Sequence, residues 1–522
     1  MIKKENLLSH LICLGLSVLL VYLLGYPQRF DRILLTYFSL IFLARFTICR
    51  IIFCISFVVA ALYFPTSFYY GSPNIAVISS IAETDSDEIS EYLTQLPIYL
   101  YVITILLVIS FIFIFSKCNF PKINNKYLII CALIVSCYKP AKIIIKSNFS
   151  NIPSILIDSF KYPIFEFCFD LYTSTNIYLT EKQEQQKQAQ QLNNIPIVTV
   201  KPKHKTFLII IGESVRKDYM SAYGFKYDDT PFTNQHASII WDGLIAPAPN
   251  TQSSIPYLIS QSIFLNDKEV NAHINNNIIS IANQAGFATY WLSNQGQLGK
   301  MEITIPRIAA YAQQSFYTKK GEYNGKSSQG KYDTLLLPEL NDILSNQSNK
   351  PQLIIMHLMG SHPHFCKRLQ FDVQFDLNNE NISCYVSSIK ETDDFVNSAI
   401  NILERHNQDY AVVYFADHGL AHTDQNQDLR HNWKYQESYQ VPFIFFDSDK
   451  MPQQRINKQI SGFQLVYLLS RWMGIELDVK HDYMQHDFNN ITEQKDIKVK
   501  DWQYNKLYLY DKLEKDPNPY IK

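Results

Sequence analysis

The chain has 522 residues, and its 47 Lys and Arg residues nearly balance its 48 Asp and Glu residues. The formal net charge of -1 excludes a typical nucleic-acid-binding protein, because such proteins carry a strong basic excess or stripe. The length exceeds that of one compact core, so at least two domains are expected.

Long apolar runs dominate residues 1–146 and predict a membrane domain, because a helix needs about 20 apolar residues to cross a bilayer. We predict five spans, at residues 7–25, 33–44, 51–64, 96–115 and 127–145. Lys and Arg residues precede the first span and follow the second and the fourth, which places these turns in the cytoplasm. Arg29 and Arg32, in the first external turn, oppose this orientation. An odd number of spans puts the remainder of the chain on the external side.

The segment 147–200 is expected to link the membrane domain to the rest. Its first part is amphipathic and rich in Phe, Tyr and Ile, and residues 181–194 form a Gln-rich stretch typical of an exposed helix or a linker. Residues 201–522 have the composition of an ordinary soluble domain.

Short β-rich runs alternate with helical patterns in this soluble part. They lie at residues 206–211, 288–292, 352–357, 410–415 and 441–446. Near-continuous apolar strands of this kind predict a sheet covered by helices on both faces. Such sheets place their chemistry beyond the carboxyl ends of the strands, so the polar residues that follow these runs are the candidates for a site.

Three of the predicted strands are followed by residues that suit metal chemistry. Glu213 follows the first run, Asp417 and His418 follow the fourth, and the third leads into a Gly-Ser-His triplet that ends at His362. Two carboxylates and an imidazole form a mixed oxygen and nitrogen donor set that suits Zn²⁺. A single carboxylate at a strand end, such as Glu213, is otherwise often a helix N-cap or a solvated loop charge, whereas an adjacent Asp-His pair followed by Gly is more specific.

A loop of small residues, 246–256, leads into an apolar helical pattern and offers a nucleophile. Thr251 would lie near the start of that helix, where unpaired N–H groups attract phosphate. A hydroxyl beside a metal can attack phosphorus, although a Thr at this position is also a common helix cap. Ser253 and Ser254 are alternative nucleophiles.

Seven of the nine cysteines lie in or beside the apolar part. The other two, Cys366 and Cys384, are compatible either with a disulfide in an oxidising compartment or with two unrelated buried thiols.

Taken together, the motifs of the soluble part resemble those of the membrane-bound phosphoethanolamine transferases that modify lipopolysaccharide. The matching motifs are IGESVRKDYMSAYGFKYDDTP at 211–231, NTQSSIP at 250–256, MHLMGSH at 356–362 and FADHG at 415–419. The resemblance covers nearly the whole chain. It implies a multi-span α-helical membrane domain at 1–146, linker helices at 147–200 and, at 201–522, a periplasmic catalytic domain with an α/β/α sandwich of the alkaline phosphatase or sulfatase type.

The resemblance also assigns roles to the residues. It implies metal ligation by Glu213, Thr251, Asp417 and His418, with one or two zinc ions bound. Thr251 matches the family's nucleophile, because it stands five residues before Pro256 in a T-x-x-x-[VI]-P pattern.

Further histidines and one acidic residue match the family's remaining positions. His362 and His431 would contact the phosphoryl group or a second metal, and His422 is an alternative to His431. Glu88, in a TDSDE element at 84–88, would help to bind substrate. His357 and His364 are expected to be structural or peripheral.

The implied reaction moves phosphoethanolamine from phosphatidylethanolamine to lipopolysaccharide at the bacterial inner membrane. Cysteines that flank the nucleophile loop in lipid A-modifying members are absent here, since Ala248 and Tyr257 occupy that neighbourhood. Only Cys366 and Cys384 remain as a disulfide candidate. Because the chain departs in this way from the lipid A-modifying members, a core sugar (heptose or Kdo) is at least as good a candidate acceptor as lipid A. The alternatives are a transferase of another headgroup such as phosphoglycerol, or a non-catalytic membrane scaffold.

Overall fold

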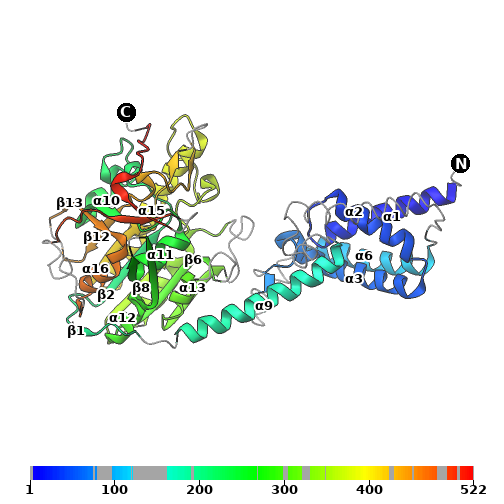
Figure 1. The fold of residues 1–522 in the computed structure, drawn as a ribbon, viewed down its shortest axis with the longest axis horizontal. Helices are drawn as coiled ribbons and strands as arrows, with labels where there is room; N and C mark the ends of the chain where they lie inside the picture. The colour runs from blue at the N-terminus through cyan, green and yellow to red at the C-terminus, as the bar shows by residue number, and fades with distance from the viewer. Residues whose placement is uncertain are drawn as a thin grey trace. The chain divides into compact units, whose positions relative to one another are not determined.

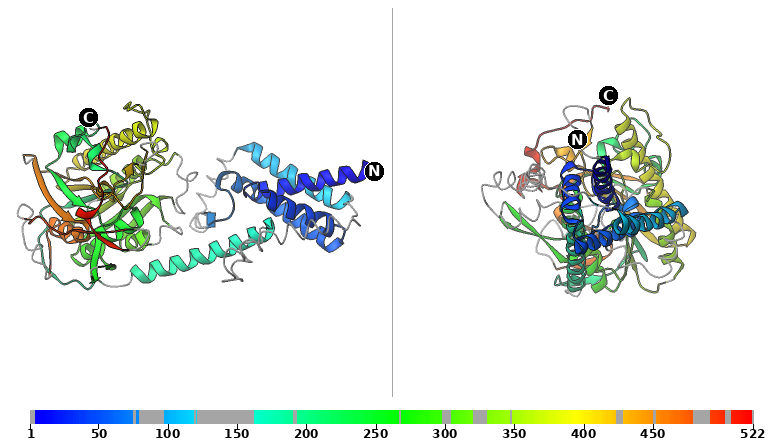
Figure 2. Two further views of the ribbon diagram at one scale, coloured as in Figure 1. Left: turned by 45° about the horizontal axis from the view of Figure 1, so that its top comes forward. Right: turned by 90° about the vertical axis from the view of Figure 1, so that its right-hand side faces the viewer.

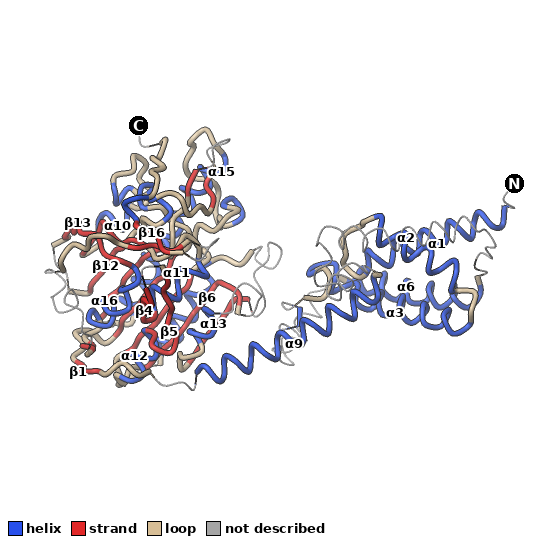
Figure 3. Tube along the Cα trace, in the orientation of Figure 1, coloured by secondary structure: helices blue, strands red, loops and turns tan. Residues whose placement is uncertain are grey.

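The chain folds into two compact units, Met1–Thr180 and Glu181–Lys522 (Figure 1). The computed structural model describes residues 4–74, 77–78, 97–118, 120, 162–189, 193–266, 268–297, 304–319, 330–346, 348–422, 428–449, 452–478, 491–501 and 506–520. The first unit is helical, and the second combines strands with helices, as Figure 3 shows.

Helices of the first unit coincide with the predicted spans wherever the structure describes them. They are α1 (Lys4–Leu23), α2 (Phe30–Leu43), α3 (Thr47–Tyr70) and α6 (Ile98–Lys117), followed by α9 (Pro163–Ala189), which continues into the Gln-rich stretch. Two segments in the described part, Thr47–Phe68 and Ile98–Lys117, are long and apolar enough to cross a membrane, and Leu7–Leu23 is a shorter apolar helix. The predicted span at 127–145 lies outside the described residues.

A buried ion pair joins α2 to α9 and accounts for one of the two arginines that opposed the predicted orientation. The guanidinium of Arg32 donates to both carboxylate oxygens of Glu166, at 3.0 and 2.8 Å. Both residues are less than a tenth exposed. Arg32 is therefore neutralised within the protein rather than presented as a free surface charge.

The second unit is built on an eight-stranded mixed sheet with the order β13-β3-β12-β9-β2-β8-β6-β7. The strands are β2 (Thr206–Gly212), β3 (Ile239–Ile245), β6 (Ala288–Gly296), β7 (Gln314–Lys319), β8 (Gln352–His357), β9 (Tyr410–Ala416), β12 (Phe443–Asp447) and β13 (Gln454–Ser461). All neighbours pair in parallel except β12, which runs antiparallel to both β3 and β9. The five predicted strands are confirmed, and they include the fully buried β2, β8 and β9 at the centre.

Four two-stranded sheets surround the main one. They are β1 (Ile197–Val200) with β14 (Ile475–Leu477), β4 (Ser260–Asn266) with β5 (Glu269–Asn277), β10 (Ala421–His422) with β11 (Leu429–Arg430), and β15 (Lys498–Lys500) with β16 (Leu507–Leu509). Because β1 pairs with β14, the second unit includes residues that the sequence analysis assigned to the linker.

Helices cover the main sheet in two groups, which gives the α/β/α sandwich that was predicted (Figure 2). The two groups comprise α10 (Pro231–His236), α14 (Leu337–Ser345) and α15 (Glu380–Arg405), and α11 (Thr251–Ile259), α12 (Ile278–Gln284), α13 (Thr304–Ala309) and α16 (Leu465–Trp472). One apolar core fills the space between the sheet and both groups, so the carboxyl ends of the central strands rest on a rigid base.

Candidate active site

The carboxyl ends of β2 and β9 bring Glu213 and the Asp417-His418 pair together. The two strands are parallel neighbours, and Gly212 at the end of β2 pairs with Ala416 at the end of β9. The next residue of each strand is therefore a buried carboxylate, Glu213 on one and Asp417 on the other.

Thr251 reaches the same place from a helix N-terminus. It is the first residue of α11, and Asn250 caps the helix by accepting a hydrogen bond from the backbone N–H of Ser253 at 2.8 Å. The Thr251 hydroxyl donates to Glu213 Oε2 at 2.8 Å and lies 3.2 Å from His418 Nε2. Thr251, Glu213 and His418 thus converge on one point.

The three ligand candidates predicted from the strand ends form one buried cluster. One ligand atom each from Glu213, Asp417 and His418 lie within 4.8 Å of one another. His418 Nε2 is 3.3 Å from Glu213 Oε1 and 3.5 Å from Asp417 Oδ2. Nδ1 of the same ring lies 2.8 Å from Gly419 O, which orients the ring so that Nε2 faces both carboxylates.

The cluster fits a divalent cation. Among the described residues, the buried Oδ2 of Asp417 has no hydrogen-bond partner. Burial and, after it, the charge of Glu213 raise the pKa of Asp417 above its ordinary value. Two buried carboxylates and an imidazole lone pair at this spacing suit Zn²⁺, which would offset the cost of their burial.

His362 and His431 lie close to this cluster and are only partly buried. The ring centroid of His431 is 4.9 Å from that of His418 and 6.4 Å from that of His362. Nδ1 of His431 is 3.2 Å from Pro249 O, and Nδ1 of His362 is 2.5 Å from Pro363 O. Burial lowers the pKa of His362, and it lowers the pKa of His431 to about 4, so burial favours the neutral form of both rings.

The other candidate side chains are engaged elsewhere. Ser254 donates to the backbone oxygen of Asp417 at 2.6 Å, which supports the ligand loop. His422 lies 2.7 Å from the hydroxyl of Tyr219 and 3.0 Å from Asp516 Oδ2. His357 is buried against Trp291, with ring centroids 5.7 Å apart. Glu88 lies outside the described residues.

Two polar residues that the sequence analysis did not single out contact the ligands directly. Ser214 has a left-handed backbone (φ 61°); its hydroxyl donates to Glu213 Oε1 at 2.6 Å and its N–H donates to Asp417 Oδ1 at 3.0 Å. Gln295 donates to Glu213 Oε2 at 3.3 Å. Gln295 lies at the carboxyl end of β6, so the strand-end rule would have found it if the run at 288–292 had been extended.

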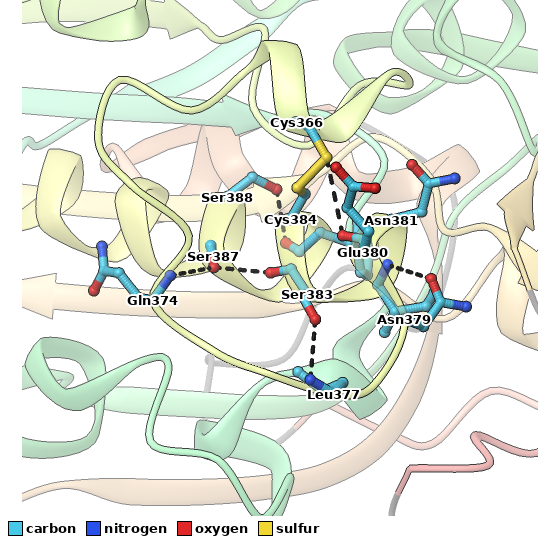
Figure 4. The surroundings of a disulfide bond; sticks show 12 residues. Cys366, Gln374, Leu377, Asn379, Glu380, Asn381, Ser383, Cys384, Ser387 and Ser388 are labelled. Atoms are coloured by element: carbon cyan, nitrogen blue, oxygen red, sulfur yellow. Dashed lines mark hydrogen bonds between the residues drawn. A yellow bond between two sulfur atoms is a disulfide. The ribbon is translucent and has the colours of Figure 1, made fainter.

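The loop that carries His362 is held from both sides. At Gly360 (φ 43°) a Cβ atom would lie 3.0 Å from Glu213 N, so only glycine allows this close approach. Beyond His362, a disulfide joins Cys366 to Cys384, as Figure 4 shows. The disulfide connects this loop to α15 and confirms the pairing of the two cysteines that the soluble part contains. A bond that closes a loop of this size contributes about 3 kcal/mol.

Comparison with known proteins identifies the class. The family model described as Sulfatase matches residues 205–475, and the chain belongs to this family. Among solved structures, the C-terminal periplasmic domain of EptC from Escherichia coli, in complex with Zn, shares the fold with a TM-score of 0.52 at 21% identity, and the match covers 63% of this chain and 99% of that one.

A relative that matches over most of its length places the chain more narrowly, among the phosphoethanolamine transferases. Phosphoethanolamine transferase OpgE of Escherichia coli (strain K12) is 30% identical over 489 residues, which cover 90% of this chain and 89% of the relative. Phosphoethanolamine transferase EptC of the same organism is 25% identical over 304 residues, 52% of each chain. The chain is thus a metal-dependent transferase rather than a scaffold.

Proposed function

We propose that the chain transfers phosphoethanolamine from phosphatidylethanolamine to lipopolysaccharide, on lipid A or a core sugar, through a covalent intermediate on Thr251. One observation carries the proposal: the hydroxyl of Thr251 lies 2.8 Å from Glu213 Oε2 and 3.2 Å from His418 Nε2. A hydroxyl at a helix N-terminus beside a metal-ligand set is placed to attack a phosphoryl group.

The residues that would hold the metal follow from the geometry. Glu213, Asp417 and His418, with Thr251 as a fourth donor, would hold one Zn²⁺, and His362 and His431 are the residues that could hold a second. Bound Zn²⁺ lowers the pKa of a coordinated hydroxyl and offsets the negative charge that develops on the phosphoryl oxygens.

The side chains of the chain itself then account for the two half-reactions. In the first, a bond forms between Thr251 Oγ1 and phosphorus while the bond between phosphorus and the glycerol oxygen breaks. The hydroxyl proton leaves Thr251 toward Glu213 Oε2, which accepts its hydrogen bond at 2.8 Å. His362 or His431 would deliver a proton to the leaving glycerol oxygen, which releases diacylglycerol. In the second, the oxygen of an acceptor hydroxyl forms a bond to the same phosphorus while the bond between Thr251 Oγ1 and phosphorus breaks. The proton of the acceptor hydroxyl passes to Thr251 Oγ1, which restores the free threonine.

The membrane part serves this reaction because both proposed substrates are lipids. We propose that residues 1–146 form five spans in the inner membrane, that 147–200 link them to the catalytic domain at 201–522, and that this domain faces the periplasm. The two long apolar helices in the described part support membrane insertion. Anchoring in the same bilayer as the substrates raises their effective concentration at the site.

Mass spectrometry of envelope lipopolysaccharide from cells with and without the protein tests the proposal. We expect a phosphoethanolamine mass difference that is lost in Thr251→Ala, with a fall in transfer of at least about 1000-fold. Ser253→Ala is the matched control, because the backbone N–H of Ser253, which survives the change, makes its contact with Asn250. Retained transfer in Thr251→Ala contradicts the nucleophile, whereas a phosphoglycerol difference, or a modified glycan other than lipopolysaccharide, contradicts the proposed substrates.

A further inference from the structure

The C-terminal segments of the chain, 491–501 and 506–520, lie beyond the residues that the family model matches, yet they contact the loops that form the site. The backbone N–H of Lys500 donates to Pro247 O at 2.7 Å, in the loop that leads to Thr251. The backbone N–H of Gln436 donates to Glu514 O at 2.9 Å, a few residues beyond His431. The C-terminal segments are therefore hydrogen-bonded to chain segments that lie close in sequence to Thr251 and His431.

The strongest of these contacts involves Arg216, three residues after Glu213. Its side chain is 1% exposed, and a buried guanidinium requires charged or polar partners. Asp218 supplies two contacts nearby, at 2.9 and 2.6 Å. Asp516, 300 residues further along the chain, supplies two more: its Oδ2 accepts from Nη1 at 2.6 Å and its backbone oxygen accepts from Nη2 at 2.8 Å.

The same carboxylate oxygen of Asp516 also holds the second ligand loop. It accepts a hydrogen bond from the backbone N–H of His422 at 2.8 Å and lies 3.0 Å from His422 Nδ1. His422 is four residues after the ligand His418. One oxygen atom thus joins the loop that follows β2 to the loop that follows β9.

The loop after β2, which carries Arg216, packs closely against the loop after β9 at Gly419. At Gly419, next to His418, a Cβ atom would lie 3.3 Å from Cγ of Arg216 and 2.2 Å from the backbone oxygen of Glu437. Glu437 is itself tied to the C-terminal segment, because its Oε2 accepts from the backbone N–H of Asp516 at 2.7 Å. A shift of Arg216 would therefore be transmitted directly to the backbone beside His418.

We propose that Asp516 is a positioning residue for the metal ligands: through Arg216 and His422 it fixes the separation between Glu213 and the Asp417-His418 pair. The proposal rests on the proposed function only in requiring that Zn²⁺ binds to these three ligands. Metal affinity depends on groups behind the ligands because they hold the donor atoms at the bonding distance.

The test compares Asp516→Asn with Asp511→Asn, which removes an exposed carboxylate from the same C-terminal segment. Zinc affinity of the full-length protein in detergent is measured by competition with a chelator, and the unfolding temperature is measured on the zinc-free protein. We expect Asp516→Asn to weaken zinc affinity about 10-fold and also to lower the unfolding temperature, because the buried Arg216 keeps only Asp218 as a charged partner. Asp511→Asn should match the wild type in both measurements. Asp516→Glu should restore most of the affinity, because it returns a carboxylate to Arg216.

Unchanged zinc affinity in Asp516→Asn overturns the proposal. If that variant does not fold, zinc affinity is measured on Asn518→Ala instead. This change removes two neutral hydrogen bonds, one from Asn518 Nδ2 to the backbone oxygen of Asp218 and one from the backbone N–H of Tyr520 to Asn518 Oδ1, each 2.9 Å long. A zinc affinity that is about three-fold lower in Asn518→Ala than in the wild type supports the positioning role of residues 506–520. An unchanged zinc affinity in this variant overturns that role. A wild-type protein that binds no zinc contradicts the metal site itself, so the two proposals fail in distinguishable ways.

Discussion

At the scale of single residues, Ser214 links the two carboxylates of the site. Its hydroxyl donates to Glu213 and its N–H donates to Asp417, and its left-handed backbone aims both groups at once. We predict that Ser214→Ala, which removes only the hydroxyl, weakens zinc affinity and lowers the rate of transfer by about 10-fold or more, because Glu213 loses a fixed orientation. Chelator competition and a transfer assay measure this, with Ser253→Ala as the control. Zinc affinity equal to that of the wild type would contradict the role of Ser214.

How far the sequence predicts the site depends on where each residue lies along the chain. Glu213, Asp417 and His418 directly follow apolar strands, so the strand-end rule finds them without knowledge of the pairing. Thr251 is predicted by a helix start. Asp516 carries no local signal, since its role depends on Arg216 being folded against it from 300 residues away.

At the scale of secondary-structure elements, His204 connects three strands of the main sheet. It lies two residues before β2, and it contacts Asp409, just before β9, and Asp447, the last residue of β12. Its Nδ1 is 2.5 Å from Asp409 and its Nε2 is 3.3 Å from Asp447. These two carboxylates raise the pKa of His204 to about 9, against the opposing effect of burial. A raised pKa stabilises the fold fully below the unfolded-state pKa near 6.5, and this stabilisation is lost as the pH rises through 9. Because Asp409 is 50% exposed, solvent screening limits the stabilisation from the charged His204 to about 1 kcal/mol.

We therefore predict that His204→Gln lowers the unfolding temperature by about 2 °C at pH 6.5 and by much less at pH 9.5. Thermal unfolding of the full-length protein at both pH values measures the difference from wild type. His236→Gln is the control, since His236 is exposed. A loss of the same size at both pH values would mean that His204 acts by packing and not by charge.

The strands at the centre of the main sheet were predictable from the sequence, and the strands at its two edges were not. The central strands β2, β8 and β9 are buried along their whole length and read as apolar runs. The outer strands β7 and β13 carry polar side chains on partly exposed positions, so no such run marks them. The antiparallel direction of β12 is a property of chain topology and leaves no trace in its five residues.

At the scale of the whole molecule, the central question is which side of the membrane carries the catalytic unit. The unit contains a disulfide between Cys366 and Cys384, and such bonds persist in oxidising compartments such as the periplasm. The ion pair with Glu166 neutralises Arg32, so Arg32 no longer counts as a free positive charge that opposes this orientation. Both observations favour an external catalytic unit, in agreement with the predicted cytoplasmic turn at Arg45.

We predict that a membrane-impermeant thiol reagent labels Asp511→Cys in intact cells and labels Arg45→Cys only after the membrane is permeabilised. Both positions are exposed, one in the catalytic unit and the other between α2 and α3. The background should lack the seven cysteines outside the disulfide, so that each variant offers one thiol. Labelling of Arg45→Cys in intact cells would reverse the orientation. It would place the Thr251 site on the cytoplasmic side, away from a lipopolysaccharide acceptor, and it would leave the Cys366–Cys384 bond in a reducing compartment.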